Sequence, residues 1–253
     1  MLPFNPNFIY LALLIFIRIG VILALCPPLG GQAIPVRMRV LLGLLLTYLA
    51  IGAAPAVTIP ESYLGVIVAG LQEAVVGLMM GMAVRLFFAV AEMAGQFIAR
   101  EIGLAMSLTI NPVEGTQDSS MSLLLYYIAG VIFFLGQFHH DVIESFVASL
   151  HWAPVGHALS AGYGVGQIIA ISAHVIYTAL QMAAPFLAVM FLVNLAFAVL
   201  GKVAPNVNVF IVSFAVRTGL GLWLVAASAG LLIQLLYQQG ERVGSGMLSW
   251  LPN

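Results

Sequence analysis

The sequence predicts an all-α membrane protein with about six long, partly kinked apolar helices arranged in hairpins. Of its 253 residues, 62% are hydrophobic and only 7% are charged, and the mean hydropathy is +1.11. Soluble domains carry about 25% charged residues, so this chain lacks the polar groups to cover a globular surface. In addition, about six apolar stretches are long enough for a helix to cross a hydrocarbon core of ~30 Å.

Prolines bound the first apolar stretches. We expect spans over residues 8–26 and 36–54, which end before Pro27 and Pro55. The third stretch begins at Tyr63, and no proline interrupts it before Asn111, so it could form roughly 70 Å of helix. That length is more than twice the thickness of the hydrocarbon core.

Three further spans are expected over residues 121–138, 167–200 and 210–237. The fourth of the six should continue as a short amphipathic helix to Leu150. The fifth, at roughly 50 Å, is too long for a simple crossing and should kink at Pro185. No repeat or linker segment is evident, which predicts one domain over residues 1–253.

The basic residues indicate an orientation. If the N-terminus lies outside, one basic residue outside the spans, Arg242, remains in an outer segment. The positive-inside rule therefore favours both termini outside. The residues then placed on the cytoplasmic side are Arg37, Arg39, Arg85, Arg100 and Lys202.

A polar stripe follows Val84 on the third helix. Arg85, Glu92, Gln96 and Arg100 are spaced 7, 4 and 4 residues apart, which places them on one helical face while the other faces stay apolar. Such a helix could form a protein wall beside an aqueous channel or lie in the membrane interface, and the residues alone leave both open.

The longest break in the apolar pattern is residues 100–122. Asn111-Pro112 stops the helix, because proline cannot donate an amide and pushes the preceding residue out of the α region. A polar loop between spans must be in water, buried in protein or lining a passage. We interpret it as lining a passage, with Met106, Leu108 and Ile110 as part of a closure.

Four ionisable residues fall inside the spans: Arg18, Glu73, His174 and Arg217. Each is costly against lipid and should face protein or water. The alternatives are a proton relay or substrate pathway, or else buried pairing and pore lining, within the chain or across a subunit interface. The small residues Gly70, Ala74, Gly77 and Gly81 form a stripe that predicts close packing against a partner helix.

Other chemistry has little support in the sequence. The cluster His139, His140, Asp141 and Glu144 lacks a zinc-binding pattern and would need a distant ligand such as His151. Cys26 follows a leucine, so a lipidation site is not favoured. We expect no metal, no cofactor, no nucleic-acid partner and no catalytic residues; an intramembrane enzyme using Glu73 or His174 is the least favoured class.

One segment carries a family resemblance. After the fifth span the chain reads Lys202-Val203-Ala204-Pro205-Asn206-Val207-Asn208-Val209-Phe210. This resembles the basic-x-A-P-Q-x-N-x-F motif of the FliR family, the export-gate subunits of flagellar type III secretion, which are related to SctT-type virulence subunits. The stretch from Glu92 through Asn111-Pro112 resembles that family's plug region, and the order and lengths of the apolar stretches also match. Asn206 stands where glutamine is usual and Asn111 where aspartate is common.

The resemblance implies more than the composition does. It implies a FliP-like portion over residues 1–166, with a plug loop at about 106–120, and a FliQ-like helical hairpin and tail over 167–253. The expected function is a structural, non-enzymatic subunit that forms the protein export channel with FliP and FliQ. The expected setting is the flagellar basal body in the bacterial inner membrane.

Further partners and roles are implied as well. FlhB should lie near the hairpin tip (Lys202, Ala204, Pro205, Asn206, Asn208 and Phe210), FlhA nearby, and membrane lipid and unfolded export substrates complete the set. The plug or gate would contain Met106, Leu108, Ile110, Asn111 and Pro112. The alternatives are a self-contained secondary transporter with midplane charges, or the virulence counterpart of the same gate.

Overall fold

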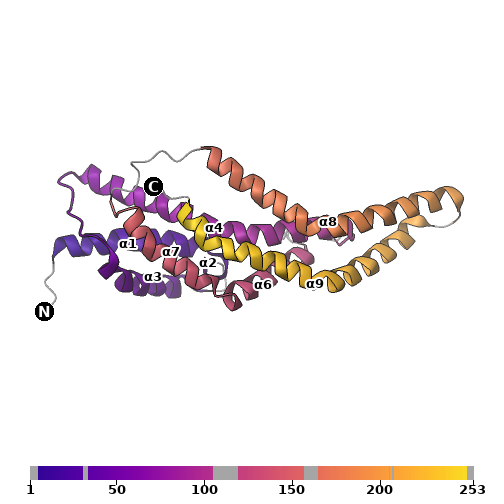
Figure 1. Ribbon diagram of the computed structural model, residues 1–253, viewed down its shortest axis with the longest axis horizontal. Coiled ribbons are helices and arrows are strands. Elements are labelled where there is room, and N and C mark those ends of the chain that lie inside the picture. Colours follow the sequence, from indigo (N-terminus) through magenta and orange to yellow (C-terminus); the bar gives the residue numbers. More distant parts are fainter. Residues whose placement is uncertain are drawn as a thin grey trace. The chain divides into compact units, whose positions relative to one another are not determined.

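The computed structural model describes residues 5–30, 34–104, 119–156, 165–204, 206 and 208–249. In these ranges the chain is helical and contains no strand (Figure 1). The elements are α1 (Pro6–Leu25), α2 (Pro27–Gly30), α3 (Val36–Ala50), the 3₁₀ helix η1 (Ile51–Ala53), α4 (Tyr63–Glu101), α6 (Ser120–Leu135), α7 (Phe138–Trp152), α8 (Val165–Val203) and α9 (Val209–Ser249).

The length and composition of these helices suit a membrane. Five of the described helices are long and apolar enough to cross one, or six if α6 and α7 count as one broken span. The prediction of an all-α membrane protein is therefore confirmed. The predicted short helix after the fourth span is α7, which begins after Gln137 in a left-handed conformation (φ 61°).

Local chemistry explains the first boundaries. The Asn5 side chain caps α1 by accepting a hydrogen bond from the Asn7 amide at 3.1 Å, and Pro6 occupies the first helical position. Cys26 ends this helix in an extended conformation just before the two prolines, and α3 begins directly after Pro35. The first two spans thus lie within two residues of their predicted starts.

Two helix ends differ from the prediction. The helix α4 ends at Glu101 rather than near Ile110, because Gly103 adopts a positive φ of 85° and turns the chain. Its 39 residues span about 58 Å, so the predicted 70 Å is wrong. The helix α9 instead continues past Tyr237 to Ser249, through Gly240 and Gly244.

The chain divides into two compact units. The first comprises Met1–Phe87, Phe134–Ile169 and Gly240–Asn253, and the second comprises Phe88–Phe133 and Ala170–Gln239. In the first unit, α3 packs along α1 (Figure 1), and the fully buried core includes Leu14, Ile15, Ile19, Ile22, Met80, Phe146 and Leu150. The prediction of a single export-gate domain with portions meeting at 166/167 stays a prediction.

The second unit contains a helical hairpin made of α8 and α9 (Figure 1). Gly221 of α9 lies so close to Ile102 and Met190 that an added Cβ would overlap Ile102. In the same unit, the Phe88 ring packs against Tyr126 and Phe133 with centroid distances of 5.5 and 5.6 Å. The outward faces of the hairpin remain apolar and exposed.

Candidate functional site

Among the described residues, a buried ion pair lies in the first unit. Arg18 of α1 and Glu73 of α4 are both 0% exposed, and Arg18 Nε donates to Glu73 Oε2 at 2.6 Å. The small-residue stripe explains how the two helices come so close. A Cβ added to Gly77 would lie 2.6 Å from the Arg18 carbonyl oxygen, and one added to Gly81 would overlap the Leu25 side chain.

The same two side chains bind the end of α7. Arg18 Nη1 donates to the carbonyl oxygen and to Oγ of Ser149 at 3.0 and 3.1 Å, and Nη2 donates to the Ala153 carbonyl oxygen at 2.9 Å. Glu73 Oε1 accepts a hydrogen bond from the Gly156 amide at 2.9 Å. The cluster therefore adds a donor to the Ser149 carbonyl near the end of α7 and to the Ala153 carbonyl just after it, and it holds the turn at Gly156, whose φ is +83°.

This arrangement suits a structural role. Both carboxylate oxygens of Glu73 accept hydrogen bonds, and each nitrogen of the Arg18 guanidinium donates at least one. A buried pair with its hydrogen bonds made holds helices in register, whereas a relay or a substrate site needs an atom open to exchange. Of the alternatives for Arg18 and Glu73, the geometry favours pairing within the chain.

The other two charges in the spans lie in the second unit and differ from this pair. His174 is exposed, with its Nε2 atom 3.3 Å from Gln239 Oε1. Arg217 is half-buried and donates to the carbonyl oxygen and the hydroxyl of Ser213, one turn earlier on α9, at 3.3 and 3.2 Å. Neither is in a salt bridge among the described residues.

The residues of the predicted polar stripe belong to α4. Arg85 and Arg100 are exposed, and Glu92 and Gln96 are half-buried. Next to the stripe, the Ser122 hydroxyl of α6 donates to the Glu92 carbonyl oxygen at 3.0 Å, and Gly95 lies against the Ser122 backbone. Glu92 therefore borders a close helix contact in the second unit, and exposure of the stripe to a channel stays a prediction.

At the predicted hairpin tip, Lys202, Asn206, Asn208 and Phe210 are exposed and Ala204 is half-buried. The Asn208 side chain accepts a hydrogen bond from the Ile211 amide at 3.4 Å and so caps the start of α9. Pro205 lies outside the described residues. So do all five predicted plug residues, namely Met106, Leu108, Ile110, Asn111 and Pro112.

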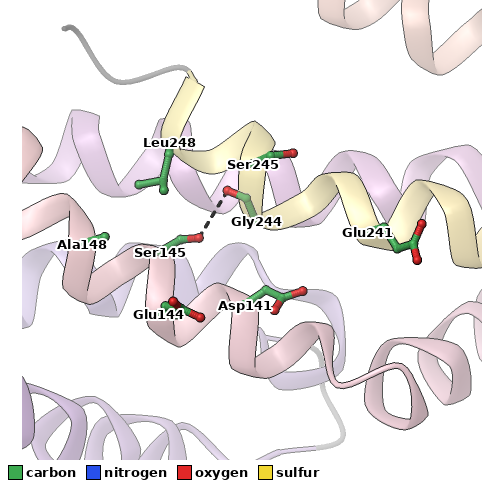
Figure 2. A pocket seen from close by; sticks show the side chains of 8 residues that line it. All are labelled: Asp141, Glu144, Ser145, Ala148, Glu241, Gly244, Ser245 and Leu248. Carbon is green, nitrogen blue, oxygen red and sulfur yellow. Dashed lines mark hydrogen bonds between the residues drawn. The ribbon is translucent and has the colours of Figure 1, made fainter.

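Two residues of the predicted cluster His139, His140, Asp141 and Glu144 line a pocket, namely Asp141 and Glu144. Figure 2 shows Asp141 and Glu144 of α7 and Glu241 of α9 around a hollow of about 320 Å³, and the Ser145 hydroxyl donates to the Gly244 carbonyl oxygen at 3.2 Å. Glu144 and Glu241 are exposed. Two glycines of α9 allow it to lie close to α7. A Cβ added to Gly240 would overlap the Phe138 ring, and one added to Gly244 would lie 3.1 Å from the Asp141 Cβ.

Comparison with known proteins assigns a family. The family described as bacterial export proteins, family 1, matches residues 9–243. The chain belongs to this family. Flagellar biosynthetic protein FliR of Caulobacter vibrioides is 28% identical over 87% of this chain and 88% of its own length. FliR of Bacillus subtilis is 28% identical over 81% of this chain and 80% of its own length.

A relative with a different name covers less of the sequence. Yop proteins translocation protein T of Yersinia pestis is 28% identical over 61% of this chain and 60% of its own length. The assignment to the FliR family from the hairpin-tip and plug-region motifs is thus confirmed. This export-family chain is also a membrane protein, by the number and composition of its helices.

Sequence reasoning missed the residues that complete the ion-pair cluster. Ser149, Ala153 and Gly156 lie 131 or more residues from Arg18 in the sequence. Ala153 and Gly156 contribute only backbone groups, and Ser149 contributes its carbonyl oxygen and its hydroxyl. No side-chain pattern marks a backbone carbonyl as an acceptor. The glycine that turns the chain after α7 was the one available signal.

Proposed function

We propose that this chain is a structural subunit of the flagellar type III export gate. With FliP and FliQ it forms the channel through which unfolded flagellar proteins leave the cell, and it carries out no catalysis. The observation that carries this proposal is the family match over residues 9–243 together with FliR relatives aligned over more than 80% of both chains. The virulence-type relatives align over 61% of the chain, which favours the flagellar system.

The helix lengths support a setting inside a protein assembly. The span-like part of α8, Ala173–Val203, has 31 residues and is about 46 Å long, and that of α9, Val209–Leu248, has 40 residues and is about 60 Å long. A hydrocarbon core is ~30 Å thick. Part of each helix must therefore meet something other than acyl chains, and in the basal body of the inner membrane that would be other subunits.

The outward face of α9 supports the same conclusion. Phe214 and Trp223 are exposed there, and between such large side chains stand small residues. No atom lies within 4 Å of a Cβ added at Gly219 or Gly230. Alternating large and small residues allow a neighbouring helix to approach closely, which is typical of helix–helix contacts in membranes.

In this proposal the predicted site residues receive separate roles. Met106, Leu108, Ile110, Asn111 and Pro112 close the channel, since flexible apolar side chains exclude water and ions yet deform around a passing chain. The stripe residues Arg85, Glu92, Gln96 and Arg100 face the lumen or a subunit interface. The exposed hairpin tip contacts FlhB, and FlhA lies nearby in the same machine.

Purification in mild detergent tests the assembly. We expect the tagged chain to leave the membrane with several different small hydrophobic subunits. A chain that instead runs as a stable monomer or homo-oligomer, and that moves a small solute across vesicles alone, would refute the proposal and favour a secondary transporter.

Permeability tests the plug. Replacing Leu108 and Ile110 together by glycine should make cells leaky to small ions while the complex still assembles. Leu135→Gly is the matched control, because Leu135 ends α6 and is 80% exposed. Permeability equal to that of the control in an assembled complex would count against a plug at these residues.

A further inference from the structure

The helix α3 has two chemically different faces. The side that packs on α1 contains Gly43, Thr47 and Ala50, all buried, and an added Cβ at Gly43 would lie 3.0 Å from the Phe16 ring. The Thr47 hydroxyl donates to the Gly43 carbonyl oxygen at 2.7 Å, so no polar side-chain atom of this face is left to a further partner.

Over Val36–Ala50 the opposite face contains no small residue; the exposed Gly52 lies beyond it in η1. Its exposed apolar side chains are Val36, Met38, Val40, Leu41, Leu44, Leu45, Tyr48 and Leu49. Helix partners in membranes select glycine, alanine, serine and threonine at the contact, as the inner face of α3 and the outer face of α9 do. A face of large apolar side chains is what acyl chains solvate, since lipid needs no close approach of backbones.

The length and the end residues of α3 fit the same surroundings. With η1 the span covers Val36–Ala53, 18 residues and about 27 Å, close to the hydrocarbon thickness and unlike the longer helices α8 and α9. Tyr48, 73% exposed, lies about one and a half turns from the far end, within the zone where aromatic residues anchor helices.

The N-terminal end of α3 differs from the rest of the helix in its charge. Arg37 is exposed at the first turn, and Arg39 Nε donates to the Ile34 carbonyl oxygen at 3.2 Å. No carboxylate occurs between Ile34 and Pro60, so the two arginines give this segment a net positive charge. The positive-inside rule predicts that this end lies on the cytoplasmic side, where the leaflet carries anionic headgroups.

We propose that the outer face of α3 is a lipid-binding surface, on which acyl chains cover Leu41, Leu44 and Leu45 and an anionic phospholipid headgroup binds Arg37 and Arg39. The occupant is membrane lipid rather than a protein helix. This surface gives the subunit a fixed depth and orientation in the bilayer, independently of which subunits cover α8 and α9.

Acyl-chain quenching tests the apolar half. The complex isolated from membranes is reconstituted in equal parts of phosphatidylcholine and phosphatidylglycerol, with a fluorophore on L45C in a C26S background. Brominated acyl chains should remove most of the fluorescence, whereas an unchanged signal would show that protein covers Leu45 and overturn the proposal. The same label at L222C, of similar native exposure (48% against 54%), reports on α9; quenching there would weaken the proposed function but not the lipid surface.

Lipid retention tests the charged half. The amount of phosphatidylglycerol that each complex retains after detergent extraction is measured. Complexes from vesicles of pure phosphatidylcholine give the background value. R37Q and R39Q should each weaken retention about fivefold, the usual contribution of one basic residue at an anionic surface. R242Q, which removes an exposed arginine of α9, should change nothing. Retention by R37Q equal to that of R242Q would overturn the headgroup site.

Discussion

Removing Arg18 while keeping Glu73 should be the most damaging single change in the first unit. In R18M, the Glu73 carboxylate stays buried without its ion-pair partner, and the Ala153 carbonyl oxygen loses its Arg18 donor. The Ser149 carbonyl oxygen keeps the hydrogen bond from the Ala153 amide at 2.9 Å. Stranding one partner of a buried pair costs about 3–5 kcal/mol. The loss of the Arg18 donor to the Ala153 carbonyl adds to that cost.

The double variant R18M/E73L separates the cost of a stranded charge from the cost of the lost hydrogen bonds. It removes both charges and leaves apolar groups of similar size, which is often neutral for a buried ion pair. The Ser149 and Ala153 carbonyls and the Gly156 amide still lose partners, so the double variant stays below the wild type. It should nevertheless be more stable than R18M. With E73L as the second single variant, the coupling between the two sites should be about 0.5–3 kcal/mol.

Thermal unfolding of the purified complex measures this cycle. For a chain of this size each kcal/mol shifts the midpoint by about 2–4 °C, so R18M should lower it by about 6–20 °C. R242M is the matched control at an exposed arginine. If R18M unfolds like R242M, or if the effects of the two single variants simply add, the ion pair does not hold the end of α7.

Two further predictions concern close packing and burial in the first unit. Gly77→Ala should cost about 1–3 kcal/mol in thermal unfolding, because its Cβ would overlap the Arg18 carbonyl oxygen, whereas Gly130→Ala, with no atom within 4 Å, should cost nothing; equal midpoints would refute the contact. The Cys26 side chain is only 2% exposed, so a thiol reagent cannot reach it in the folded protein. Alkylation of Cys26 should therefore be much slower in the native protein than in the denatured chain, and equal rates would contradict its burial.

Proline and periodicity predicted the helices that end for local reasons. The boundaries of α1 and α3 follow from adjacent prolines, and α7 follows from its amphipathic pattern. The early end of α4 was missed because Gly103 sits within a continuous apolar pattern, and periodicity does not report the φ of one residue. The last turns of α9 were missed because their composition is polar, and contacts of Gly240 and Gly244 with α7 accompany their helical conformation.

For the ion-pair cluster too, the sequence predicted some features and missed others. The cost of charges in a span predicted that Arg18 and Glu73 would avoid lipid, and spacing predicted that Gly77 and Gly81 would face a helix. The identity of each partner depends on the tertiary fold, since Arg18 and Glu73 lie 55 residues apart in the sequence. The turn at Gly156 completes the cluster through a backbone amide, and the glycine itself is its one signal in the sequence.

Polar and apolar groups are satisfied differently in this subunit. The buried charges of Arg18 and Glu73 complete their hydrogen bonds within the chain, so assembly with other subunits need not neutralise them. Exposed apolar faces remain on α3, α8 and α9, and they differ in kind. The exposed apolar side chains of α3 are all large, whereas α9 also exposes glycines. Partner subunits can therefore stabilise α9 by packing helices against its exposed glycines rather than by pairing charges. On α3, in the proposal above, the acyl chains of the bilayer cover the exposed apolar face.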